Sequence, residues 1–465
     1  MEFTFPVNKV SNMEEDTNCS VEPVGDAGAE SGTPSPAEVE LSDAAARTAT
    51  PRMTITTSTT YSTTTSTPST TLGDAHLEAV KVHMTTTVKK AREQNSADPQ
   101  GELQNGATNP EAPPSHGPSH VFSPEWSSLS KEEVVDKVKG TIYGQAIGDA
   151  IGLATECMSK AEARGLYGEQ GPGGYQRTYV DFHRSRWDEG DWTEDTDQML
   201  VILQSVVDTG GKVERHHFAK RLNDWMIFGF PELGDVGGMG IGTMVHKALA
   251  NVQFLSSPHE AAREVWERSG RYLATNEALM RTSVLGVVNF NNLDKVTSNT
   301  NEICAVTHAD PRCAASCVAM TTTLALMLQG KYDPMKEEGN KALVAEALEY
   351  ACKHLSLDEQ RRELRDHVMS SSLEDLKLDE ESSISYTFKA LGAGFYGLRK
   401  ATDFRKTIME LIMEGGDADS NGAVCGALMG CKLGFKALPQ DLLQFKNRQW
   451  LDERVDSFLR LIGLI

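Results

Sequence analysis

Apolar residues recur at helical spacing along most of the chain from about residue 122 onward. In the first such stretch, Val135, Val138, Ile142 and Ala146 lie three or four positions apart, which is the spacing of one face of an α-helix. Ser130 precedes this stretch and a Glu follows it three positions later, as in a helix-capping box. The pattern therefore predicts a long helix that begins just after Ser130.

The same periodicity predicts ten further helices. They are expected at 195–207, 216–228, 260–272, 311–328, 341–354, 357–369, 384–399, 404–413, 420–435 and 451–464. A strand-like pattern is confined to one short segment, 177–183. We therefore predict an all-α fold, a compact many-helix domain over residues 122–465.

Residues 1–121 have a different composition, rich in Thr, Ser, Pro, Glu, Ala and Gly, with few large apolar side chains. The run TATPRMTITTSTTYSTTTSTPSTT, at 48–71, is of low complexity. Such a segment buries too little apolar area to offset the roughly 1–2 kcal/mol per residue that ordering a backbone costs. The composition predicts a disordered low-complexity tail at 1–121.

Charge and the start of the chain exclude several classes of partner. The net charge of −21 disfavours a general affinity for nucleic acid. The first residues, MEFTFPVNKVSNMEED, lack the basic region and apolar stretch of a secretory signal, so a cytoplasmic or nuclear location is expected. No segment predicts a membrane span, so no membrane partner is expected. The oligomeric state stays open.

Two of the predicted helices begin with many side-chain oxygens. These come from Thr193, Glu194 and Asp195 in one helix and from Asp417, Asp419 and Ser420 in the other. Helix capping explains either cluster taken alone, because Asp, Ser and Thr are favoured caps and acids suit the first turn. Two such clusters favour a cation, since grouped carboxylates repel one another. Oxygen ligands select Mg²⁺, Ca²⁺ or Mn²⁺, and a two-metal centre is predicted.

The helix that starts with DADSNG carries glycines at four-residue intervals: Gly422, Gly426, Gly430 and Gly434. They lie on one face of the helix, although a glycine inside a helix costs about 1 kcal/mol relative to alanine. We expect another backbone to approach closely along this face. This helix is then buried at the centre of the domain, with its acidic start at a cleft.

Three segments, in this order, resemble the ADP-ribosylglycohydrolase family, which includes the dinitrogenase-reductase-activating glycohydrolases. They are GDAIGLATE, WTEDTDQM and GGDADSNGAVCGALMGCKLG. The stretches GGMGIGTMVHKAL, TNEALMRTSVLG and THADPRC are also similar to family sequences. The resemblance covers about residues 139–435, which is most of the predicted folded part.

The resemblance implies hydrolysis of the glycosidic bond at the anomeric carbon of ADP-ribose, with two Mg²⁺ in a cleft of an all-α domain. The metal ligands that it implies are Thr193, Glu194, Asp195, Asp417, Asp419 and Ser420. Glu156 matches the family's acid near the ribose and is expected to act as catalytic acid or base. Asp149 is expected to support the metal ligands through water.

Further residues are candidates for binding the substrate. Backbone N–H groups of Gly238, Gly240 and Gly242 suit a diphosphate, although such a run also suits a flexible loop. Asn276 and His308 are candidate substrate contacts, with helix capping and a structural role as the alternatives. The expected partner is an ADP-ribosylated protein or an ADP-ribose-containing small molecule. Arginine-linked, serine-linked and acetylated ADP-ribose all stay open.

The chain departs from the family pattern at two positions. The family usually has Asp where this chain has Glu194; the longer side chain either still reaches the metal or changes the coordination in favour of Mn²⁺ or Ca²⁺. The family often has Gly where this chain has Glu277, a carboxylate that repels a diphosphate unless it points away. The alternative hypothesis is a non-catalytic member, either an ADP-ribose-binding module or a crystallin-like structural protein.

Overall fold

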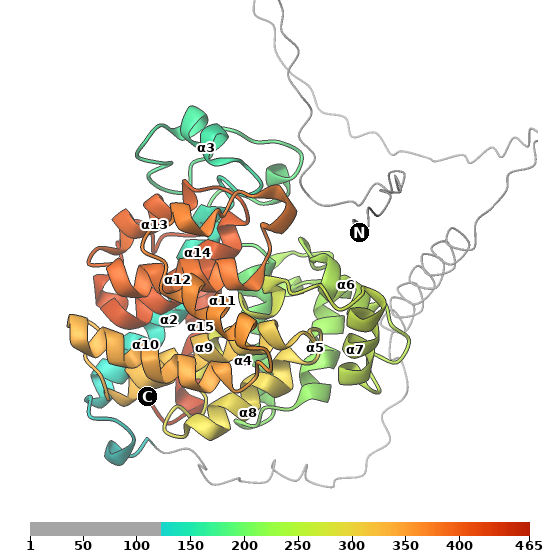
Figure 1. Cartoon of the computed structure of the whole chain (residues 1–465), viewed down its shortest axis with the longest axis vertical. Coiled ribbons are helices and arrows are strands. Elements are labelled where there is room, and N and C mark those ends of the chain that lie inside the picture. The colour runs from blue at the N-terminus through green and yellow to red at the C-terminus, as the bar shows by residue number, and fades with distance from the viewer. Residues whose placement is uncertain (1–121) are drawn as a thin grey trace, which may run out of the picture. The chain divides into compact units, whose positions relative to one another are not determined.

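Helix α2 (Lys131–Gly152) is the first α-helix in the computed structural model, which describes residues 122–465 (Figure 1). The predicted capping box fixes its start. The Ser130 hydroxyl accepts a hydrogen bond from the Glu133 N–H at 3.2 Å, and the Glu133 carboxylate accepts one from the Ser130 N–H at 2.8 Å. The predicted disordered tail at 1–121 lies outside the described residues.

The all-α prediction is confirmed for residues 122–465. The other α-helices are α3 (Lys160–Tyr167), α4 (Glu194–Asp208), α5 (Arg215–Phe228), α6 (Thr243–Leu249), α7 (Pro258–Arg268), α8 (Leu293–Cys304), α9 (Pro311–Gln329), α10 (Glu337–Cys352), α11 (Asp358–Val368), α12 (Thr387–Lys400), α13 (Phe404–Ile412), α14 (Ala418–Leu433) and α15 (Arg448–Leu461). Short 3-10 helices are η1 (Pro124–Trp126), η2 (Arg184–Arg186), η3 (Pro231–Leu233), η4 (Asn276–Ala278), η5 (Ser283–Gly286), η6 (Glu374–Leu376), η7 (Glu381–Ser383) and η8 (Phe435–Ala437).

Segment 177–183 forms no strand and is irregular, so the one strand-like pattern was misleading. The backbone β-bridge among residues 122–465 joins Thr275 to Tyr386. Helices α3, α6 and α8 were not predicted. Helices α3 and α6 are short, with eight and seven residues, and α3 buries only Ala163, so each offers few apolar positions from which a helix could be recognised.

Helices α2 and α14 pack backbone against backbone at the centre of the domain. A Cβ added to Gly148 would lie 2.0 Å from the Gly422 carbonyl oxygen, and one added to Gly426 would lie 2.0 Å from the Gly144 carbonyl oxygen. In Figure 1, α14 lies beside α12 and over the teal α2. The predicted close approach is confirmed, and the contact brings the end of α2 to the acidic start of α14.

Helix α9 is long and apolar enough to cross a membrane, the only such helix found within residues 122–465. However, 83% of its most apolar window is buried inside the domain. Its Thr321, Thr322 and Thr323 hydroxyls donate to backbone carbonyls of the preceding turn, which satisfies them in this apolar setting. Helix α9 is therefore a core helix of the domain.

Candidate active site

Asp149, near the end of α2, fastens the first turn of α4. Its Oδ1 accepts hydrogen bonds from the N–H and hydroxyl of Thr193, at 3.0 and 2.8 Å. Its Oδ2 accepts from the N–H and hydroxyl of Thr196, at 2.9 and 2.6 Å. Burial raises the pKa of Asp149 to about 6, and the four hydrogen bonds act against this rise. Both oxygens of Asp149 are thus engaged in orienting the Thr193 turn.

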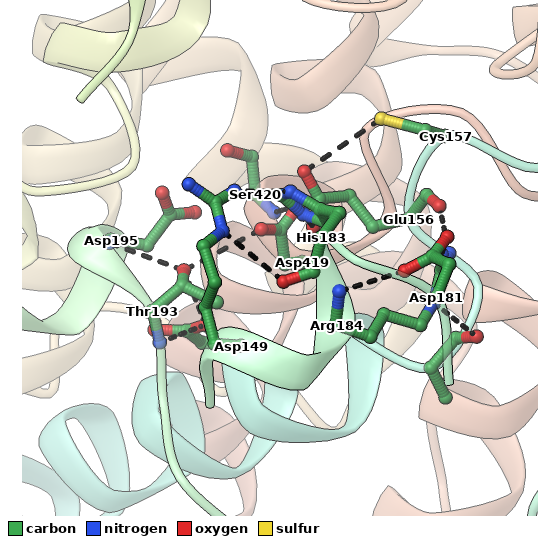
Figure 2. Close-up of polar contacts among 12 residues, drawn as sticks. Asp149, Glu156, Cys157, Asp181, His183, Arg184, Thr193, Asp195, Asp419 and Ser420 are labelled. Carbon is green, nitrogen blue, oxygen red and sulfur yellow. Dashed lines mark hydrogen bonds and ion pairs between the residues drawn. The ribbon is translucent and has the colours of Figure 1, made fainter. Parts of the chain in front are cut away.

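The acidic starts of α4 and α14 meet, although they lie far apart along the chain. The Thr193 hydroxyl is 3.5 Å from Oδ2 of Asp419, which lies in the first turn of α14. The Asp195 carboxylate interacts with the Ser420 hydroxyl. Figure 2 shows Thr193, Asp195, Asp419 and Ser420 gathered in one region. Four of the six predicted ligands, Thr193, Asp195, Asp419 and Ser420, are thus linked by contacts between their side chains.

The buried carboxylates in this region repel one another when they are all ionised. Burial, and then the charge of Asp195, raises the pKa of Glu194 well above its ordinary value. Burial, and then the charge of Glu156, does the same for Asp419. Among the described residues, Glu194 Oε2 and Asp195 Oδ2 are buried with no hydrogen-bond partner. Buried polar atoms left unpaired cost about 1–3 kcal/mol each, so these oxygens need a partner that the protein does not supply.

These residues fit a hard cation by the chemistry of their donors. All six predicted ligands offer oxygen, and Mg²⁺, Mn²⁺ and Ca²⁺ prefer such ligands. Within residues 122–465, however, no three or more His, Cys, Asp or Glu side chains converge into a ready-made metal cage. The Glu194 carboxylate instead lies against the Gly-rich loop, where a Cβ on Gly240 would be 1.7 Å from Glu194 Oε2.

Asp417 is supported from the side by Asn276. The Asn276 amide donates to Asp417 Oδ2 at 3.0 Å, and the Asn276 N–H donates to the Ser385 carbonyl at 2.9 Å. Burial is the main cause that raises the pKa of Asp417, and the hydrogen bonds from Ser385 and Asn276 lower it. Asn276 therefore orients a candidate metal ligand.

His308 is a buried structural residue in this geometry. Its Nε2 lies 2.9 Å from the Thr275 hydroxyl, and its Nδ1 lies 2.8 Å from the Thr307 hydroxyl. Burial lowers the pKa of His308 well below its ordinary value. Both ring nitrogens are engaged within the protein, as expected for a structural histidine.

The Gly-rich loop is held by protein groups. The Gly238 N–H donates to the Met226 carbonyl at 3.2 Å. Glu277 accepts from the N–H groups of Met244 and Val245, at 3.2 and 2.8 Å, and so caps α6. A Cβ on Gly242 would meet the Glu277 carboxylate at 2.4 Å. Glu277 therefore points into the loop. Of the three glycines proposed to bind a diphosphate, only Gly240 and Gly242 have backbone N–H groups without a hydrogen-bond partner among the described residues.

Glu156 is held by a segment whose role the sequence did not reveal. Its Oε2 lies 2.6 Å from Nε2 of His183 (Figure 2). The Arg184 guanidinium donates to the carbonyls of Glu156 and Ala154. The strand-like pattern at 177–183 includes His183, but it gave no sign that this residue contacts Glu156.

Comparison with known proteins decides the family. The family model described as ADP-ribosylglycohydrolase matches residues 130–464. This chain belongs to the ADP-ribosylglycohydrolase family. The match takes in nearly all of the described residues and both acidic helix starts.

Several relatives carry names of the same family. An ADP-ribosylarginine hydrolase Tri1 from Serratia proteamaculans is 24% identical over 74% of this chain and 83% of the relative. An ADP-ribosyl-[dinitrogen reductase] glycohydrolase from Rhodospirillum rubrum is 22% identical over 72% of this chain and 100% of the relative. An uncharacterised protein from Archaeoglobus fulgidus is 29% identical over 70% of this chain and 97% of the relative.

A solved structure shares the fold. It is described as an ADP-ribosylglycohydrolase-related protein complex, aligns with a TM-score of 0.50 at 22% identity, and covers 71% of this chain and 99% of its own. At this identity the likeness shows the fold alone. Membership of the ADP-ribosylglycohydrolase family supports hydrolysis of an ADP-ribose linkage by this chain.

Proposed function

We propose that this chain is a metal-dependent hydrolase of the glycosidic bond between ADP-ribose and a protein side chain or small-molecule acceptor. The observation that carries the proposal is the meeting of the starts of α4 and α14, with buried unpartnered oxygens on Glu194 and Asp195. The proposed ligands of two Mg²⁺ are Thr193, Glu194, Asp195, Asp417, Asp419 and Ser420, and Mn²⁺ is the second choice of metal. When bound, such ions hold ribose hydroxyls and activate water.

The protein's own groups divide into three roles in this proposal. Glu156 takes the proton of the attacking water as its oxygen bonds to the anomeric carbon, and returns a proton to the departing acceptor as the glycosidic bond breaks. Asp149 and Asn276 position the Thr193 turn and Asp417. The amides of Gly240 and Gly242 are the proposed diphosphate contacts.

A panel assay tests the proposal directly. ADP-ribose release is measured from arginine-linked, serine-linked and O-acetyl substrates, each with Mg²⁺, Mn²⁺ or EDTA. Arginine-linked substrate comes first, because one relative is named an ADP-ribosylarginine hydrolase. We expect release from at least one substrate with metal and none with EDTA. Equal release with metal and with EDTA would refute the metal-dependent mechanism.

One observation favours a second candidate, a non-catalytic member of the family. The carboxylates of Glu194 and Glu277 both lie against the Gly-rich loop, where they oppose a diphosphate. Calorimetric ADP-ribose binding without release in the panel would support this candidate. Absence of both binding and release would leave the crystallin-like structural role.

A further inference from the structure

The Glu156 carboxylate is in close contact with one histidine from the loop that precedes α4. Glu156 Oε2 and His183 Nε2 are 2.6 Å apart, and the two side chains are 13% and 9% exposed. This separation is short even for a hydrogen bond that involves an ionised group, for which about 2.7–2.9 Å is usual. The short distance identifies a close hydrogen bond, and the low exposure of both side chains shows that it is largely shielded from water.

The other ring nitrogen of His183 reveals which atom carries the proton. Arg186 Nη2 contacts His183 Nδ1, and Arg186 Nε donates to the His183 carbonyl at 3.2 Å. A guanidinium has only donors, so His183 Nδ1 must present its lone pair to Arg186. The ring proton is then on Nε2, where it points at Glu156. Arg186 thus selects the one tautomer of His183 that donates to the carboxylate.

Neighbouring residues keep the His183 ring in this orientation. The Trp187 ring lies edge-on to it, with centroids 5.1 Å apart, and the Arg186 guanidinium lies 4.7 Å from the Trp187 ring centroid. Arg177 donates to the carbonyls of Arg184 and Trp187, at 2.7 and 2.6 Å. Hydrogen bonds and ring contacts therefore hold this loop together, and Arg184 binds it to the segment that follows α2.

We propose that His183 is a positioning residue for Glu156, a role that rests on the proposed hydrolase function. Its Nε2–H fixes the rotation of the carboxylate and occupies Oε2. A proton taken from water in the hydrolysis therefore goes to Oε1 of Glu156. Nothing in this role requires His183 to contact the substrate, so it acts on the rate of the chemical step and leaves binding of ADP-ribose largely unchanged.

The test compares three variants with the unmodified full-length protein on its preferred substrate. His183→Phe keeps a planar ring and removes the donor, whereas His183→Gln keeps an amide donor near the position of Nε2. His216, an exposed residue of α5, supplies the matched control His216→Phe. Kinetics give kcat and KM separately, calorimetry gives ADP-ribose affinity, and thermal unfolding gives stability.

We expect His183→Phe to lower kcat by roughly 10- to 100-fold, as for other residues that orient a catalytic group, with KM and ADP-ribose affinity within about threefold of the unmodified protein. His183→Gln should recover most of the rate, and His216→Phe should match the unmodified protein. A kcat unchanged in His183→Phe, or equal losses in the Phe and Gln variants, would overturn the proposal. Absence of release by the unmodified protein would instead overturn the hydrolase function, and the role of His183 with it.

Discussion

The glycine contact between α2 and α14 predicts a large effect of one added methyl group. In Gly426→Ala, the new Cβ would lie 2.0 Å from the Gly144 carbonyl oxygen and 2.7 Å from the carbonyl carbon. Both are backbone atoms of a buried helix, so no side chain can rotate to make room. To reach even 3.0 Å, the two helices must separate by about 1 Å.

The expected loss of stability follows from two opposing terms. Overpacking a rigid interior costs typically 1–3 kcal/mol, and a backbone-to-backbone clash belongs at the upper end of that range. In the opposite direction, replacing glycine by alanine inside a helix stabilises the helix by about 1 kcal/mol. We therefore expect Gly426→Ala to lower the free energy of unfolding by roughly 2 kcal/mol. The shift also separates Asp149 from Asp419, and displacements of about 1 Å can reduce turnover 100-fold.

Urea unfolding, followed by circular dichroism, measures the loss of stability, and the release assay measures turnover. Gly165→Ala is the matched control, since Gly165 lies in the exposed part of α3 with nothing within 4 Å of an added Cβ. The control should be neutral or more stable by up to about 1 kcal/mol. A Gly426→Ala protein as stable as the control would refute the reasoning from close backbone packing.

Three further predictions concern the site and the chain boundary. Asp417→Ala and Asp419→Ala should each abolish metal-dependent release while far-UV circular dichroism stays unchanged; full activity in both variants would contradict the metal assignment. Glu277→Ala should lower the free energy of unfolding by about 1 kcal/mol through loss of the α6 cap. An unchanged urea midpoint would argue against that cap. Deletion of residues 1–120 should leave release intact, and an unfolded truncated protein would show that the domain boundary is wrong.

The parts of the fold that could be predicted are those encoded locally. The capping box at Ser130 and the acidic starts of α4 and α14 are each written in a few consecutive residues. The glycine repeat of α14 predicted that another backbone packs closely against this helix, but the sequence analysis did not identify which segment supplies it. That partner is an equivalent repeat in α2, which the spacing of Gly140, Gly144 and Gly148 would have revealed.

The parts that could not be predicted depend on segments that meet only in three dimensions. The motif placed Asp149 near the metal ligands, yet its four hydrogen bonds to α4 depend on how α2 and α4 cross. His183 lies in an irregular loop, and no local pattern indicates that it returns to Glu156. Glu277 was recognised as a departure from the family, but its carboxylate caps α6 and so has a structural use.

The pairing of α2 with α14 also bears on how the protein is made. The two helices are separated by about 270 residues, so Gly148 is synthesised long before Gly422 is available to pack against it. Closing a loop of this length costs little more entropy than closing a loop of half that length. The contact nevertheless cannot form until the distant segment has been synthesised, and such non-local contacts slow folding. A chain released early, before α14, has Asp149 and Thr193 but lacks Asp417, Asp419 and Ser420. Incomplete products of translation therefore contain only half of the oxygen cluster.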